Sequence, residues 1–141
     1  MFDKLKERIS AAILRFLSKP TARYAPFFAP EPEVLKSSWR RGDIILIEGN
    51  TRLSAVIKFL TQSTWSHAAL YVGERPGDIA PSGEPNVLLE AEADTGVNTA
   101  PLSKYAGYNL RICRAVGLTD ADRDEVIDYA LARIGKLYDS K

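Results

Sequence analysis

The chain contains a single histidine, His67, which lies where a polar turn meets a strand-like run. The run covers Ala68–Val72 and ends at Gly73. An imidazole at such a place can act as a general base, because its ordinary pKa lies close to neutral pH. One imidazole cannot form a multi-histidine metal site, so we expect neither a metal nor another cofactor. A histidine at the start of a strand is also often purely structural.

Glu90 is the candidate partner of His67. It follows the apolar residues 87–89, and burying a carboxylate in such a run is costly unless it is paired. If the two strands are neighbours, Glu90 can hold one ring nitrogen while the other faces the reacting group as base. Two alternatives stay open: Glu90 faces solvent at a strand end, or Glu92, on the same side of a regular strand, takes the role instead.

Trp65 and Ser66 directly precede the histidine, and we expect them to contribute to substrate binding. Trp65 can form a wall of the substrate site beside His67, although simple core packing explains it equally well. A different chemistry is suggested by Asp94-Thr95-Gly96, which matches the loop of aspartic proteases and would require a dimer to bring two aspartates together. An acidic turn with glycine at its bend explains the same residues more simply.

The composition is that of an ordinary globular domain. Of 141 residues, 45% are hydrophobic and 26% are charged, and the 19 basic and 18 acidic side chains give a net charge of +1. This balance argues against nucleic-acid binding, which usually shows a basic excess. The one cysteine, Cys113, excludes a disulfide within the chain and a cysteine-rich zinc cluster, so a cytoplasmic setting is the default expectation.

Three segments follow one another along the chain. Residues 1–19 predict an amphipathic helix, and residues 20–37 predict an extended strap rich in proline and aromatic residues whose rings we expect to dock. The helix can pack on protein, or its residues 1–18 can make a peripheral contact with an anionic membrane. No stretch approaches the ~20 apolar residues of a membrane-spanning helix. Its apolar stripe consists of Phe2, Leu5, Ile9, Ile13, Phe16 and Leu17.

Residues 38–141 form the third segment, in which strands and helices alternate irregularly. The pattern predicts a helix over 51–61 capped by Thr51, and a last helix over 120–134 capped by Thr119 and stopped at Gly135. Leu53, Val56, Ile57 and Leu60 should share one apolar face of the first of these helices. The order of elements indicates an α+β fold. Strands are predicted over 44–47, 68–72, 87–91 and 108–115.

Several of these motifs, taken in order, resemble the permuted papain-like amidases of the NlpC-type superfamily, relatives of the lecithin–retinol acyltransferases. The resemblance covers roughly residues 38–139. It is carried by Gly42-Asp43-Ile44-Ile45-Leu46, Trp65-Ser66-His67-Ala68-Ala69-Leu70-Tyr71-Val72-Gly73, Leu89-Glu90-Ala91, Gly96-Val97 and Pro101-Leu102.

The resemblance implies a small antiparallel sheet packed against helices, in a circularly permuted papain-like core. It also implies a thiol-dependent amidase or acyl hydrolase acting on a peptide or lipid acyl substrate, with His67 as base and Glu90 as its orienting partner. In that family the nucleophilic cysteine lies further downstream, at the start of a helix. We therefore expect a chain truncated before its nucleophile and inactive in this form.

Cys113 is the only thiol in the chain that can be considered as a substitute. It lies in a strand-like segment, without a helix N-terminus to lower its pKa, and a cysteine in a strand usually serves packing. The alternative function is a non-catalytic binding or membrane-peripheral module with the same fold.

Overall fold

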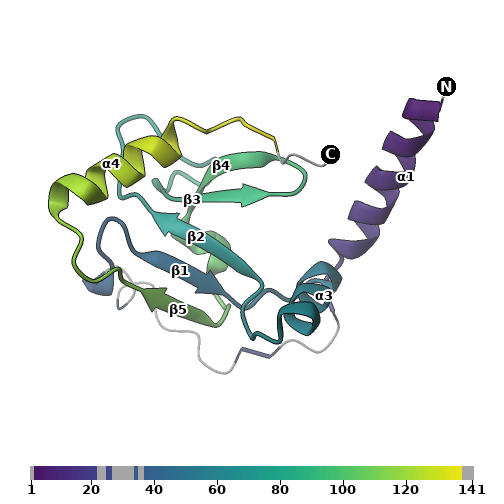
Figure 1. Cartoon of the computed structure of the whole chain (residues 1–141), viewed down its shortest axis with the longest axis horizontal. Helices are drawn as coiled ribbons and strands as arrows, with labels where there is room; N and C mark the ends of the chain where they lie inside the picture. The colour runs from purple at the N-terminus through teal and green to yellow at the C-terminus, as the bar shows by residue number, and fades with distance from the viewer. Residues whose placement is uncertain (1, 22–24, 27–33, 35–36, 138–141) are drawn as a thin grey trace.

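The fold is built on one antiparallel sheet (Figure 1). A computed structural model describes residues 2–21, 25–26, 34 and 37–137. The five strands lie in the order β4-β3-β2-β1-β5. Together with the helices this is the predicted α+β architecture, and it is consistent with a permuted papain-like fold. The strands are β1 (Ile44–Ile47), β2 (His67–Tyr71), β3 (Asn86–Glu92), β4 (Gly96–Pro101) and β5 (Leu110–Cys113).

Successive side chains of each strand point to opposite faces of the sheet, and each face has its own core. One core contains Ile45, Ile47, Ala69 and Leu88 together with the ring of Tyr105. On the other face, Val72 and Leu89 pack against Ile127 of α4 (Asp120–Leu131). Because Ala69 pairs with Glu90 across β2 and β3, both His67 and Glu90 belong to the first face.

Several predicted elements are confirmed. The helix expected over 51–61 is α3 (Arg52–Thr61), and the Thr51 side chain accepts a hydrogen bond from the backbone N–H of Ser54. Thr119 caps α4 through a reciprocal pair of hydrogen bonds with Asp122. The strand predicted over 108–115 is shorter, because only four residues of β5 pair with the four-residue β1.

Other expectations were wrong. The last helix ends at Leu131 rather than at 134, since residues 132–136 turn back toward β4, where the N–H of Gly135 donates to the carbonyl of Val97. Strand β4 was not predicted, because glycine, asparagine and proline are poor strand formers. It forms as an edge strand through pairing with β3, and the 3₁₀ helix η1 (Leu102–Tyr105) follows it directly.

The N-terminal helix α1 (Phe2–Leu17) projects away from the sheet beside α3 (Figure 1). It is joined to the domain at its C-terminal end, where the N–H of Thr21 donates to the carbonyl of Asn50 and that of Arg52 donates to Lys19. Among the described residues, no helix has the length and the apolar character needed to cross a membrane. Tyr24, Phe27 and Phe28 of the predicted strap lie outside the described residues.

Asp43, at the start of β1, ties this strand to the end of β5. Its buried carboxylate accepts two hydrogen bonds from Arg114, Nε to Oδ1 and Nη2 to Oδ2, each 2.7 Å long. The backbone N–H of Arg40 donates a third, at 2.8 Å. Charge-assisted, two-point pairing of this kind is strong and fixes orientation as well as distance. The Gly-Asp strand start therefore has a structural role.

We expect Asp43→Ala to lower the free energy of unfolding by roughly 2 kcal/mol, since it removes the acceptor of the Arg40 N–H and leaves the Arg114 guanidinium only the carbonyl of Ser38. Urea denaturation followed by circular dichroism measures the effect. Asp124→Ala is the matched control, because it removes a carboxylate from an exposed pair with Arg41 at 3.1 Å. Equal urea midpoints for the two variants would contradict the role given to Asp43.

Candidate functional site

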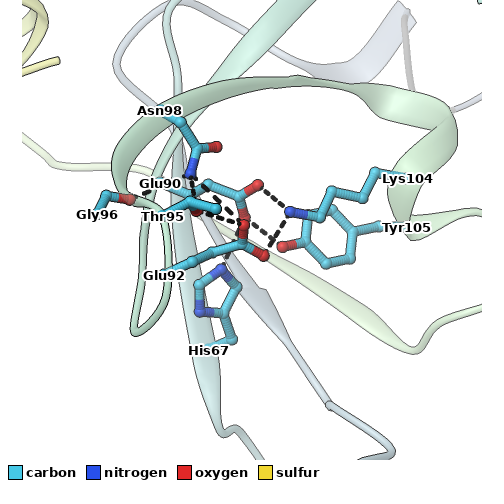
Figure 2. Close-up of polar contacts among 8 residues, drawn as sticks. All are labelled: His67, Glu90, Glu92, Thr95, Gly96, Asn98, Lys104 and Tyr105. Carbon is cyan, nitrogen blue, oxygen red and sulfur yellow. Dashed lines mark hydrogen bonds and ion pairs between the residues drawn. The ribbon is translucent and has the colours of Figure 1, made fainter. Parts of the chain in front are cut away.

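The structure brings His67 and Glu90 into direct contact (Figure 2). His67 is the first residue of β2 and Glu90 lies in the neighbouring β3, and the distance from His67 Nε2 to Glu90 Oε2 is 2.8 Å. The Glu90 side chain is completely buried, whereas 27% of the His67 side chain is exposed. The imidazole therefore stands between a buried carboxylate and open space.

Two further side chains hold Glu90, and both come from η1. Lys104 Nζ forms an ion pair with Glu90 Oε1, and the Tyr105 hydroxyl donates a hydrogen bond to Glu90 Oε2 (Figure 2). Strand β4 ends at Pro101, and the single 3₁₀ turn that follows carries these two residues back over β3. Both oxygens of the carboxylate are thus occupied by donors.

The electrostatics of this cluster favour the ionised carboxylate. Burial by itself raises the pKa of Glu90, but the hydrogen bonds from His67, Lys104 and Tyr105 outweigh burial and lower it to about 2. Burial opposes the charge on Lys104 as well, yet its contacts with Glu90 and Glu92 raise the pKa of the ammonium group. Burial and the adjacent Glu90 raise the pKa of the Tyr105 hydroxyl, which therefore stays protonated as a donor.

Glu92, the other candidate partner of His67, makes different contacts. Its Oε1 lies 2.6 Å from Lys104 Nζ, and its Oε2 accepts a hydrogen bond from Thr95 Oγ1 at 3.1 Å. The pairing of β2 with β3 ends at Ala69 and Glu90, so Glu92 is not held against the histidine. Glu90 is therefore the carboxylate that contacts His67, and Glu92 supports it through the shared lysine.

His67 lines a groove with a volume of about 520 Å³. The groove lies between the His67 end of the sheet and the inner sides of α1 and α3. Among the described residues, no hydrogen bond reaches His67 Nδ1, so this nitrogen is open to a reacting group. Apolar side chains from the two helices line the groove together with polar ones from the turn before β2, from η1 and from the loop before β5. They include Leu14, Leu53, Ile57, Ser66, Lys104 and Tyr108.

Of the two residues predicted to bind substrate, only Ser66 lines the groove. Its Oγ accepts a hydrogen bond from the N–H of Gly49 at 2.9 Å, which joins the entry to β2 to the end of β1. Trp65 is partly buried and is not among the residues that line the groove.

Cys113 lies on the wrong face of the sheet to serve His67. It pairs with Ile44 of β1, which in turn pairs with Leu70, and Leu70 packs in the core beneath α4. His67 instead pairs with Ile47, three residues further along β1, which is roughly 10 Å of strand. Neither position nor orientation lets this thiol approach the imidazole.

Asp94 is exposed in the turn between β3 and β4, at the edge of the groove. An aspartic protease needs its aspartate in a buried dyad, so the geometry does not support that alternative. Within the part of the chain that is described, no cluster of three or more histidine, cysteine, aspartate or glutamate side chains could hold a metal ion.

Sequence reasoning missed Lys104 and Tyr105. Neither residue is conspicuous in the sequence, because η1 follows a strand that was itself not predicted. A lysine and a tyrosine in adjacent positions are common in loops. Only the return of η1 over β3 shows that they share one carboxylate.

The depressed pKa of Glu90 predicts a specific dependence of stability on pH. The ionised Glu90 stabilises the folded state fully above pH 4.5, the pKa of this carboxyl in the unfolded chain. This stabilisation is lost as the pH falls toward about 2, its pKa in the folded state. A lowering of the Glu90 pKa by this amount corresponds to about 3 kcal/mol in the free energy of unfolding. Urea unfolding at pH 7, 5 and 3 should show wild type more stable than Glu90→Gln at pH 7, with the gap narrowing by pH 3. A gap independent of pH would contradict the prediction.

The contact also predicts the tautomer of the neutral imidazole. An ionised carboxylate only accepts hydrogen bonds, so His67 must carry its proton on Nε2, which leaves Nδ1 with a free lone pair. Because the chain has one histidine, a two-dimensional ¹H–¹⁵N spectrum of the ring reports it without assignment. We expect the Nε2–H form in wild type and a more mixed population in Glu90→Gln. An Nδ1–H form in wild type would overturn the assigned geometry.

Comparison with known proteins identifies the family of this chain. No curated protein matches the chain. The model of one family, described as permuted papain-like amidase enzyme, YaeF/YiiX, C92 family, matches residues 38–141, which include the sheet, α3 and α4, and the whole His67–Glu90 cluster. With about three quarters of its length matched, the chain belongs to the permuted papain-like amidases of the YaeF/YiiX type.

Proposed function

We propose that this domain is the base-bearing part of a thiol-dependent amidase or acyl hydrolase. The observation that carries the proposal is the contact between His67 Nε2 and the buried Glu90, with Nδ1 left open at the groove. The family supports a hydrolase of the cysteine type. Peptide bonds, lipid amides and esters offer the same carbonyl, so the proposal includes all three substrate classes.

In the proposed reaction, His67 Nδ1 takes the proton from a cysteine thiol, and the thiolate attacks the substrate carbonyl carbon. Glu90 holds the opposite side of the ring and stabilises the imidazolium that forms. The Nδ1 proton then passes to the leaving amine or alcohol as its bond to carbon breaks, which leaves a thioester. Water, deprotonated by Nδ1, attacks this thioester and releases the acid and the thiol.

The thiol must come from outside the described residues, and we propose that it is carried by chain that follows Lys141. This agrees with the downstream position of the cysteine in the resembling family. The direction of the C-terminal segment supports it further, because Lys136 accepts a hydrogen bond from the N–H of Val97 at 2.8 Å. The segment passes so close to Gly96 that a Cβ there would lie 2.3 Å from the Lys136 carbonyl oxygen.

Gly96 begins β4 opposite Glu92, at the end of the sheet where His67 begins β2. The last described residues therefore reach the same end of the sheet as the groove. A nucleophile supplied from this direction needs no rearrangement of the sheet.

The coding sequence is first read past Lys141 to define the full-length protein. That protein is then labelled with an electrophilic acyl probe, and the rate of labelling is measured. We expect His67→Ala to slow labelling at least 100-fold, and Glu90→Gln to slow it about tenfold, because the ring remains but loses its orientation. Cys113→Ser is the matched control and should label like wild type.

Unchanged labelling in both His67→Ala and Glu90→Gln would refute the assigned roles. Loss of labelling in Cys113→Ser would identify Cys113, in β5, as the nucleophile. A coding region that ends at Lys141 would instead favour the second candidate, a non-catalytic binding module, which the placement of Cys113 on the opposite face of the sheet supports.

A further inference from the structure

The apolar stripe of α1 is exposed at four positions, whereas Leu17 at its end is partly buried. These four side chains are between 51% and 57% exposed and face away from the groove: Leu5, Ile9, Ile13 and Phe16. Leu14 and Ser18, on the other side of the helix, line the groove. The amphipathic helix therefore contributes its less apolar side to the domain and presents its most apolar side to the surroundings.

Helix α3 continues this apolar surface. Val56, Phe59 and Leu60 are 46%, 74% and 72% exposed, whereas Leu53 and Ile57 line the groove. The four residues predicted to share one apolar face of α3, Leu53, Val56, Ile57 and Leu60, therefore differ in their surroundings. Two of them line the groove, and the other two, Val56 and Leu60, are exposed.

The two helices meet at Phe16 and Arg52. The Arg52 guanidinium lies over the Phe16 ring, 4.1 Å from its centre, and Arg52 shares one side of α3 with Val56 and Phe59. The stripe of α1 and the outer side of α3 thus form one surface, which we call the helix-pair surface. Continuous apolar surfaces of this kind usually mark a site of interaction with a partner or a membrane.

The charges around the helix-pair surface are basic. Residues 1–19 contain five basic and two acidic side chains, a net charge of +3, while the whole chain has +1, so residues 20–141 carry −2. At 3.6 residues per turn, Lys6 falls on one flank of the stripe and Arg8 and Arg15 fall on the other. Glu7 falls on the opposite side of the helix.

This distribution of charge disfavours a second copy of the chain as the partner that covers the helix-pair surface. Two α1 helices packed through their stripes would bring Lys6, Arg8 and Arg15 against the same basic residues, without acidic partners. The partner of this surface must cover apolar side chains and must also carry negative charge. An anionic lipid surface does both, since it accepts the apolar side chains and attracts the flanking cations. The helices do not span the bilayer and would lie in its interface.

We infer that the helix-pair surface docks this protein on anionic lipid membranes. Because the inner sides of the same helices line the groove, docking holds the groove beside the lipid surface. The inference is independent of the proposed activity, since it rests on exposure and charge alone and its test has no catalytic readout.

The test is co-sedimentation of the full chain with vesicles, either phosphatidylcholine alone or an equal mixture with phosphatidylglycerol. Wild type should bind the anionic vesicles at least tenfold more tightly. Ile9→Glu in α1 and Phe59→Glu in α3 should each weaken that binding at least tenfold. Arg8→Glu combined with Arg15→Glu should remove the preference for anionic lipid.

Val116→Glu is the matched control, because Val116 is 99% exposed in the turn between β5 and α4, away from both helices. It should bind like wild type, and circular dichroism confirms that every variant is folded. Equal binding by all variants, or no binding by wild type, would overturn the inference. Self-association of wild type that Ile9→Glu abolishes, without vesicle binding, would assign the surface to a second copy instead.

Discussion

The site depends on one buried charge. Glu90 has no exposed side-chain surface, and a carboxylate in that position is tolerated only with several donors around it. His67, Lys104 and Tyr105 supply these donors from two different elements, β2 and η1. The same contacts that satisfy the carboxylate therefore fix the imidazole ring, its neutral tautomer and the position of η1 over the sheet. Stability and chemistry share one set of hydrogen bonds.

The alternation of side chains along the strands decides which groups can act together. The pairing of Ala69 with Glu90 places the acid on the face where β2 begins with His67. The pairing of Cys113 with Ile44 places the only thiol of the chain on the other face, with the core beneath α4. A shift of one residue in either register would exchange these faces, because the side-chain period of a strand is two. The hydrogen bonds of Asp43 with Arg114 help to hold β1 and β5 in that register.

Helices α1 and α3 contribute side chains both to the groove beside His67 and to the exposed apolar surface. Leu14 of α1 and Leu53 and Ile57 of α3 line the groove next to His67, while other apolar side chains of the same helices are exposed. An amphipathic helix normally buries its apolar side on its own domain. Here the same two helices line the groove and carry exposed apolar side chains, so that whatever binds this surface also lies next to the groove.

The sequence by itself determined the α+β class, the capped helix at 51–61, the start of the last helix and the family, because these depend on local periodicity, capping residues and ordered motifs. It also singled out His67 and Glu90, since one histidine and one carboxylate in an apolar run are conspicuous. It did not reveal β4, η1 or the contacts of Lys104 and Tyr105, because an edge strand of weak formers exists only through its pairing with β3. Which face each residue occupies was likewise decided by the tertiary structure, since strand register depends on contacts between distant segments.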